Sequence, residues 1–211
     1  MKKYELTSET KIVFGHVLYR IKALSSFGYV SAGDLGGFLE SEKNLSQNGN
    51  AWVSGNAEVY GNAEVYGNAE VSGNARVSGN AWVSGNAEVY GNAEVYGNAE
   101  VSGNARVSGN ARVSGNAWVS GNAEVYGNAE VSKIGSIFWI GAVGSRNDTA
   151  TFFRCTDGVI RVTCGCFFGN LDEFAKKVRK THGDNDHAKV YMLAIDMAKI
   201  RISTEKEKTE E

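Results

Sequence analysis

The chain has 211 residues, and its hydrophobic content of 42% is typical of a folded protein rather than a disordered one. A count of 22 basic and 24 acidic residues leaves a net charge of −2, which argues against nucleic acid as a partner. The sequence shows no apolar run long enough for a signal peptide or a bilayer span, so we expect a cytoplasmic protein without a membrane partner.

Residues 1–33 predict a cap made of β-strands. Apolar and polar residues alternate in the segment KIVFGHVLYRIKAL, and the pair Gly15-His16 suits a turn between two strands. We interpret His16 as a turn residue. Because a repeat follows, and the ends of repeat structures need covering, we expect this region to close the N-terminal end of the repeat.

A six-residue repeat occupies the middle of the chain. From Gly49 onward the unit Gly-Asn-Ala-x-Val-(Ser or Tyr) recurs in 14 unbroken copies, whose valines run from Val53 to Val131. Within each unit the alanine and the valine are two residues apart, so a strand points both to one side and the residue between them to the other. The Gly-Asn pair supplies the conformation of a turn. Each hexad therefore predicts a short strand and a corner, with alanine and valine inside.

This repeat resembles the hexapeptide repeat of left-handed parallel β-helices, in which three hexads make one coil of about 18 residues. The resemblance implies an all-β solenoid over residues 34–132. It also implies a homo-oligomer, with a trimer as the arrangement that the family suggests. Leu39 and Leu45 continue the inward alanine register upstream, which predicts that the first coil begins near Asp34.

The repeat lacks the residues that carry activity in the known proteins of this family. Its acyltransferases resemble one another in a catalytic histidine and in loops that protrude from the coils, whereas residues 48–132 contain neither. Ice-binding members resemble one another in threonine-lined faces, and this segment contains no threonine. We therefore predict a non-catalytic solenoid, and a diverged hexapeptide acyltransferase stays as the alternative.

With three hexads in each coil, the outward residues fall on three faces. One face carries charges that alternate in sign from Glu58 to Glu130, and a second carries Trp52 followed by charged residues. The third face combines two tryptophans with two glutamates and predicts a possible interface, because exposed aromatic residues often mediate association. Ordinary strand surface is the alternative interpretation. The residues of the possible interface are Glu64, Trp82, Glu100 and Trp118.

Residues 133–203 differ in composition from the repeat and predict a small α+β module of three strands followed by two helices. Apolar residues favour strands around Ile137–Ile140, Thr151–Cys155 and Val159–Phe168. The pair Asp157-Gly158 is typical of a hairpin turn between the second and the third of these strands.

Capping residues mark the two helices of this module. Asn170 and Glu173 have the spacing of a capping box at the start of the first helix, and Gly183 ends it. Residues 204–211 predict a disordered, solvated tail. The expected core stripe of the second helix consists of Val190, Leu193, Ala194, Met197 and Ile200.

The candidate ligand-binding residues lie in the same module. Residues 133–180 carry eight basic and four acidic side chains, and a polar turn is expected between the first two strands. Guanidinium, hydroxyl and imidazole groups suit a small anionic ligand, whereas a plain turn and two helix caps explain the same residues without one. The candidate residues are Arg146, Asn147, Asp148, Thr149, His182 and His187.

Two thiols and two imidazoles raise the question of a metal site. Cys164, Cys166, His182 and His187 are of the ligand types that zinc prefers. However, residues 160–168 alternate in polarity, which places both thiols on the apolar face of a strand and predicts that both are core residues. The sequence therefore predicts no metal and no cofactor, with zinc as the alternative.

Two further resemblances concern the ends of the chain. Residues 33–53, GDLGGFLESEKNLSQNGNAWV, resemble the lead-in of hexapeptide-repeat proteins from bacteria and their phages, and the C-terminal module resembles parts of phage and prophage proteins. They imply a phage-type, non-catalytic scaffold or binding protein, whose partner is an unknown protein or a small anionic ligand. The alternative is a phage counter-defence or host-takeover protein that sequesters a nucleotide or a host protein.

Overall fold

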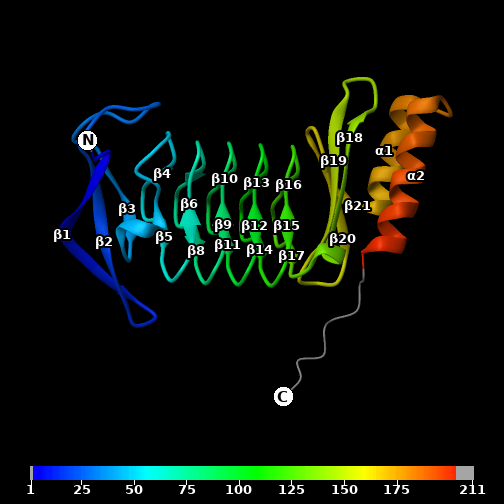
Figure 1. Ribbon diagram of the computed structural model, residues 1–211. Helices are drawn as coiled ribbons and strands as arrows, with labels where there is room; N and C mark the ends of the chain where they lie inside the picture. Colours follow the sequence, from blue (N-terminus) through cyan, green and yellow to red (C-terminus); the bar gives the residue numbers. More distant parts are fainter. Residues whose placement is uncertain (1, 203–211) are drawn as a thin grey trace, which may run out of the picture.

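The computed structural model describes residues 2–202, and the predicted tail at 204–211 lies outside them. The described chain is a rod built from stacked coils, with a β-cap at its N-terminal end and a sheet covered by two helices at its C-terminal end (Figure 1). The predicted fold class is therefore confirmed: a parallel β-solenoid with three strands in each coil, an N-terminal β cap and a small C-terminal α+β module.

The N-terminal cap is an antiparallel hairpin joined to the first coil. Strands β1 (Tyr4–Val13) and β2 (His16–Ala23) pair with each other, and β2 also pairs with β3 (Leu35–Leu39). A short 3-10 helix, η1 (Glu42–Asn44), follows β3. Because β3 runs parallel to β5 (Glu58–Val59), it is the first layer of one solenoid sheet, so the cap and the coils share a continuous hydrogen-bonded ladder.

The solenoid consists of 14 two-residue strands, β4 to β17, one for each hexad. Every strand pairs in parallel with the strand three hexads away, as in the pairing of Val95 with both Val77 and Val113. This spacing of 18 residues confirms three hexads for each coil. The strands are β4 (Trp52–Val53), β5 (Glu58–Val59), β6 (Glu64–Val65), β7 (Glu70–Val71), β8 (Arg76–Val77), β9 (Trp82–Val83), β10 (Glu88–Val89), β11 (Glu94–Val95), β12 (Glu100–Val101), β13 (Arg106–Val107), β14 (Arg112–Val113), β15 (Trp118–Val119), β16 (Glu124–Val125) and β17 (Glu130–Val131).

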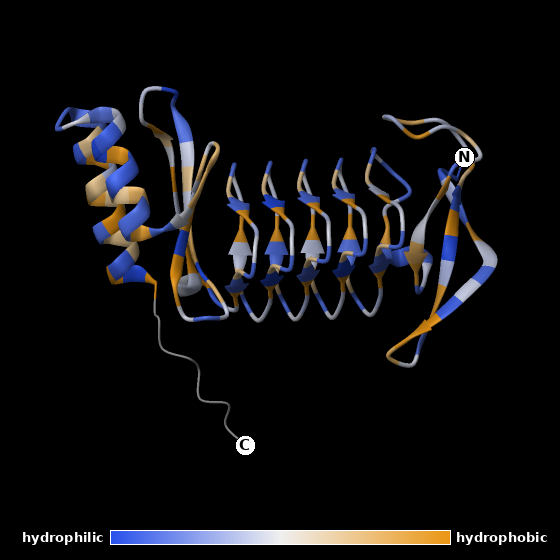
Figure 2. Cartoon of the chain, turned by 180° about the vertical axis from the view of Figure 1, so that it is seen from behind, coloured by the Kyte–Doolittle hydropathy of each residue, from blue (hydrophilic) through white to orange (hydrophobic). Residues whose placement is uncertain are grey.

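Identical residues stack on one another along the rod. The alanines and valines of all 14 hexads are buried, whereas the charged residues between them are at least partly exposed. Hydrophobic and hydrophilic residues therefore follow one another along each coil (Figure 2). The corner asparagines form side-chain ladders, for example from Asn80 to Asn98 at 3.0 Å. On one face Arg76 bridges Glu58 and Glu94, as the alternating charges predict. The interior of the solenoid is thus apolar, and polar side chains on its outer surface form hydrogen bonds and ion pairs with adjacent coils.

The first coil departs from the predicted register. Leu39 and Leu45 are buried, but they pair with Val59 and Val65, which lie 20 residues further on. They therefore occupy valine positions rather than the alanine positions that the sequence predicted. The coil that contains η1 is two residues longer than the others, and a count of hexads alone does not reveal such an insertion.

The N-terminal cap also changes the environment of Trp52. The sequence placed this side chain on an outer face, and it does lie on the sheet with Glu70, yet it is almost fully buried. The rings of Tyr4 and Phe27 meet it edge to face, with centroids 6.4 and 5.4 Å away. Trp52 therefore anchors the cap to the first coil instead of facing solvent.

The C-terminal module has four strands rather than the predicted three. After the 3-10 helix η2 (Ile134–Ser136) come β18 (Ile137–Val143), β19 (Asp148–Arg154), β20 (Ile160–Cys164) and β21 (Phe167–Asn170), all antiparallel. The predicted strand at 159–168 breaks because Gly165 has a φ of 56°, which turns the chain back on itself. The turn at Asp157-Gly158 is confirmed.

The two faces of this sheet pack against two different hydrophobic cores. Phe153 and Ile137 belong to the apolar core of the solenoid, whereas Phe152 belongs to a second core beneath the helices. The helices are α1 (Leu171–His182) and α2 (Asp186–Arg201), and they lie together on the side of the sheet away from the coils (Figure 1). The sheet therefore closes the solenoid on one side and carries the helices on the other.

The predicted helix ends are confirmed, but Ala194 is the one residue of the predicted core stripe of α2 that is buried. Asn170 and Glu173 form the capping box of α1, and Gly183 ends it. In α2 apolar residues surround the helix, so the sequence offers two possible core faces, and the face that was expected inside is largely exposed. The buried residues of α2 are Ala188, Tyr191, Ala194, Ile195 and Ala198.

Candidate functional site

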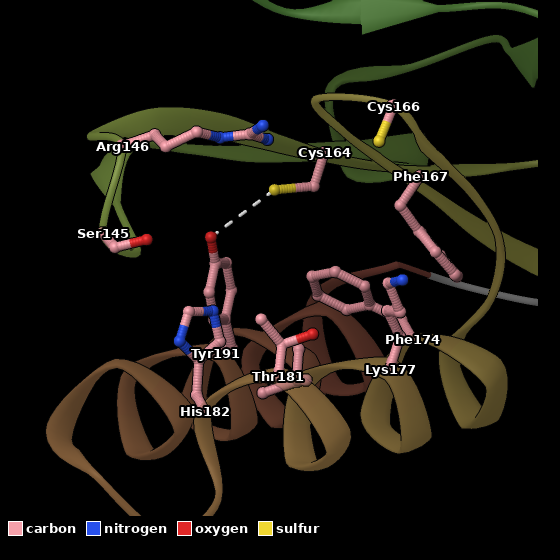
Figure 3. Close-up of a pocket in the computed structure, with 11 residues that line it drawn as sticks. Ser145, Arg146, Cys164, Cys166, Phe167, Phe174, Lys177, Thr181, His182 and Tyr191 are labelled. Carbon is pink, nitrogen blue, oxygen red and sulfur yellow. Dashed lines mark hydrogen bonds between the residues drawn. The ribbon is translucent and has the colours of Figure 1, made fainter.

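A cleft of about 300 Å³ opens between the hairpin ends of the C-terminal sheet and the two helices (Figure 3). Three elements contribute its walls: the turn between β18 and β19, the turn between β20 and β21, and the inner side of the helix pair. The residues that line the cleft are Ser145, Arg146, Cys164, Cys166, Phe167, Phe174, Lys177, Val178, Thr181, His182 and Tyr191.

Glycines at the two turns allow close approach at the mouth of the cleft. Gly144 has a φ of 71°, and a side chain there would overlap the hydroxyl group of Tyr191. Gly165 has a φ of 56°, and a side chain there would overlap the guanidinium group of Arg146. Because only glycine combines a left-handed backbone with so little bulk, these two residues let Arg146 and Tyr191 converge on one space.

The side chains around the cleft are mainly cationic and aromatic. Arg146 projects from its turn over the cleft, and Lys177 and His182 reach it from α1 (Figure 3). One acidic neighbour, Asp148, pairs with Arg146 at 3.1 Å, but both side chains are largely exposed, so water screens this pair. The rings of Phe167 and Phe174 form an apolar wall beside the cationic groups of Arg146 and Lys177. The cleft thus suits an anion that carries a flat apolar part.

A buried thiol and a phenol close the floor of the cleft. The sulfur of Cys164 lies 3.6 Å from the hydroxyl oxygen of Tyr191. Burial raises the pKa of the Cys164 thiol, and the hydrogen bond with Tyr191 only partly opposes this. Burial, together with the same hydrogen bond, also raises the pKa of Tyr191. Both groups are therefore protonated at neutral pH, and Cys164 is a poor nucleophile because the thiolate is the reactive form.

The structure brings some of the predicted ligand-binding residues together and leaves others outside the cleft. Arg146 and His182, which are 36 residues apart in the sequence, line the same cleft. His187 lies beside His182, with ring centroids 5.6 Å apart, but it is not part of the lining. Asn147 forms the turn with a φ of 53°, and Thr149 lies within β19.

Lys177 and Tyr191 are cleft residues that the sequence reasoning missed. Neither residue was singled out as a candidate. Tyr191 lies one helical turn from Ala194, which belongs to the predicted core stripe of α2, and Lys177 lies one helical turn from buried Phe174. Helical spacing could therefore have indicated that these two residues lie beside buried positions. The turns that complete the cleft belong to the sheet, and helical periodicity does not predict them.

The prediction for the two thiols was half wrong. Cys164 is buried as expected, whereas Cys166 is exposed because the turn at Gly165 interrupts the alternation that placed both on one face. Across residues 2–202, three or more histidine, cysteine or acidic side chains do not gather at any point where they could hold a metal ion.

A second candidate site lies on the solenoid. Trp82 and Trp118 share the sheet formed by β6, β9, β12 and β15 with Glu64 and Glu100, as predicted. We call these four residues the tryptophan face. Trp82 is 49% exposed and Trp118 is 47% exposed. The ring of Trp118 also meets Trp139 of the C-terminal module edge to face, with centroids 6.2 Å apart. Whether this face is an interface stays a prediction.

The stacked hexads define the chain as a repeat protein of the β-solenoid class. A family model described as YdcK Beta solenoid repeat matches residues 69–85, 99–115 and 105–121. These segments lie within the solenoid and do not include the cap or the C-terminal module, so the match supports the fold and names no activity. A search of curated proteins finds no match to the chain. None of the helices within residues 2–202 is long and apolar enough to cross a membrane.

Proposed function

We propose that this protein is a non-catalytic scaffold in which a rigid solenoid presents a C-terminal module that binds a small anionic ligand. The contacts that hold the solenoid together lie within it: alanine and valine fill its interior, asparagines form hydrogen bonds along the corners, and charged side chains pair between coils. Its length is set by the number of coils. These are properties of a spacer that holds two ends at a fixed separation.

The observation that carries the ligand-binding part is the cleft itself. Arg146, Lys177 and His182 approach one space whose wall is formed by Phe167 and Phe174. Its volume of about 300 Å³ is at the lower end of the range of small-molecule sites. The ligand class that fits is a carboxylate or phosphate attached to one flat ring, because the cations take the anionic group and the rings take the apolar part.

The chemistry of the cleft favours binding over catalysis. The only buried thiol in its lining is protonated at neutral pH and donates to, or accepts from, a phenol that is protonated as well. His182 packs against the rings of His187 and Tyr191, with centroids 5.6 and 5.8 Å away. An activated nucleophile needs a base within hydrogen-bonding distance, and this arrangement does not provide one for Cys164.

The test is a calorimetric titration of the full chain with benzoate, inorganic phosphate and nucleoside monophosphates. We expect saturable binding of at least one anion with a ring, and a loss of about tenfold in affinity for Lys177→Gln, since a charge-assisted hydrogen bond contributes roughly 1.5 to 3 kcal/mol. Lys176→Gln is the matched control, because its neighbouring position on α1 is exposed and outside the cleft. Equal affinities for the two variants would refute the site, and so would an absence of binding to every probe.

Sequestration is a second candidate function for the same cleft. The sequence resemblance to phage and prophage proteins suggests counter-defence or host takeover as its setting, and the size and charge of the cleft suit a nucleoside monophosphate. Native mass spectrometry of the protein purified from its natural host distinguishes the candidates. A stoichiometric bound nucleotide would favour sequestration, whereas ligand that exchanges freely would favour a scaffold.

A further inference from the structure

Helix α2 is apolar on two opposite faces. One face packs on the sheet and belongs to the second core, with Ala194 and Ile195 at its centre. The opposite face points away from the sheet and contains four large apolar side chains. They are Val190, Leu193, Met197 and Ile200, and they are 40%, 64%, 50% and 88% exposed. We call these four residues the α2 seam.

The spacing of the α2 seam fits a second helix. The four residues follow one another at intervals of three, four and three, which is the a and d pattern of a heptad over two repeats. Buried Tyr191, Ile195 and Ala198 take b and f positions, on the side of the helix away from a and d. Buried Ala194 takes an e position, so the seam is directed away from the core and only its e side borders on the core. Four adjacent apolar side chains on one exposed ridge are typical of an association surface.

The part of the chain that the structure describes leaves the seam uncovered. The exposed fractions above include every contact made by residues 2–202. The residues that follow them in the sequence, STEKEKTEE, contain no apolar side chain that could pack against leucine or isoleucine. An apolar stripe with the a and d pattern is suited to packing against a second helix of the same kind.

Charges beside the seam favour a second copy in parallel orientation. Asp196 takes a g position and Arg201 takes the e position five residues later, so two parallel copies of α2 place Asp196 of each copy beside Arg201 of the other. Both side chains are exposed, and Asp196 also forms an ion pair with Lys199 at 3.5 Å. An antiparallel pair would instead bring the two copies of Asp196 together, which is unfavourable.

We propose that two copies of this chain associate through their α2 seams in parallel. Because α2 lies across the end of the rod, such a pair joins the C-terminal ends and directs the two solenoids away from each other (Figure 1). The contact is small, so we expect a reversible dimer whose mass depends on concentration. This proposal is independent of the anion cleft, and either can fail without the other.

Analytical ultracentrifugation of the full chain over a range of concentrations tests the dimer. We expect Leu193→Glu to raise the dissociation constant at least tenfold while the unfolding temperature is retained, since Leu193 is outside the core. Asp196→Arg and Arg201→Asp should each weaken the dimer, and the two together should restore it. The double variant Trp82→Ser with Trp118→Ser is the control and should not change the mass.

Cysteine crosslinking then tests the orientation. In a Cys166→Ser background, Leu193→Cys should give a disulfide-linked dimer on oxidation, because equivalent d positions face each other only in a parallel pair. A wild-type protein that is monomeric at all concentrations would overturn the proposal. A fall in mass confined to the tryptophan variant would also overturn it, and so would a charge exchange that does not restore the dimer. Crosslinking that needs Leu193→Cys in one copy and Met197→Cys in the other would indicate an antiparallel pair and would contradict the parallel orientation.

Discussion

Val95→Asp is expected to destabilise the protein by at least about 4 kcal/mol. Val95 is completely buried between Val77 and Val113, so the change removes roughly 1.5 to 3 kcal/mol of apolar burial and adds the cost of an unpaired carboxyl group in an apolar stack. Burial raises the pKa of the introduced group above its value in the unfolded chain. The destabilisation should therefore increase as pH rises above about 4, where the unfolded chain loses its proton.

Urea unfolding of Val95→Asp and of Ser108→Asp at pH 4 and pH 7 checks this result. Ser108 follows the inward valine of its hexad by one residue and is only partly buried, so its replacement should change stability by about 0.5 kcal/mol or less. Comparable losses in the two variants would contradict the assignment of the valines to the inside.

Gly103→Ala is expected to cost about 2 to 5 kcal/mol, although it adds only a methyl group. Gly103 has a φ of 70°, and a Cβ atom there would lie 2.9 Å from the backbone nitrogen of Gly121 in the next coil. The loss combines the strain of a left-handed backbone, about 1 to 2 kcal/mol, with the overpacking of two coils that are held by backbone hydrogen bonds.

Gly183→Ala separates these two contributions. Gly183 also has a left-handed φ, of 58°, but a Cβ atom there would meet no heavy atom within 4 Å. Its replacement should therefore cost only the backbone strain of about 1 to 2 kcal/mol. Thermal unfolding of both variants measures the difference. If the two melt at the same temperature, close stacking of the corner glycines does not limit the repeat.

The solenoid was predictable because each hexad repeats the same local sequence pattern. Alanine and valine two residues apart, followed by Gly-Asn, specify a strand and a corner, and 14 copies leave no ambiguity about the stacking partner. The errors occurred where a neighbouring element changes the environment. Trp52 occupies a regular outward position, yet the aromatic rings of Tyr4 and Phe27 cover it, and the hexad contains no information about the cap.

The candidate site was only partly predictable. Arg146 and His182 were singled out as polar residues in turns, but their convergence depends on Gly144 and Gly165, which fold two hairpins over the helix pair. For α2, the apolar residues satisfy helical spacing on both sides, so periodicity alone could not decide whether Leu193 or Ile195 faces the core. Only the packing of the sheet against one side resolves that choice, and it leaves the other side for a partner.

The distance between the two ends of the rod tests the scaffold most directly. Spin labels attached at Lys22 and Lys180, both exposed, in a Cys166→Ser background report it by pulsed electron resonance, with unlabelled protein added to dilute pairs between molecules. Removal of Glu88–Ala105 excises one coil and joins Ala87 to Arg106 in register. We predict one narrow distance that shortens by about 4.8 Å in the deletion variant. A broad distribution, or an unchanged distance after the deletion, would contradict a rigid solenoid that sets the position of its C-terminal module.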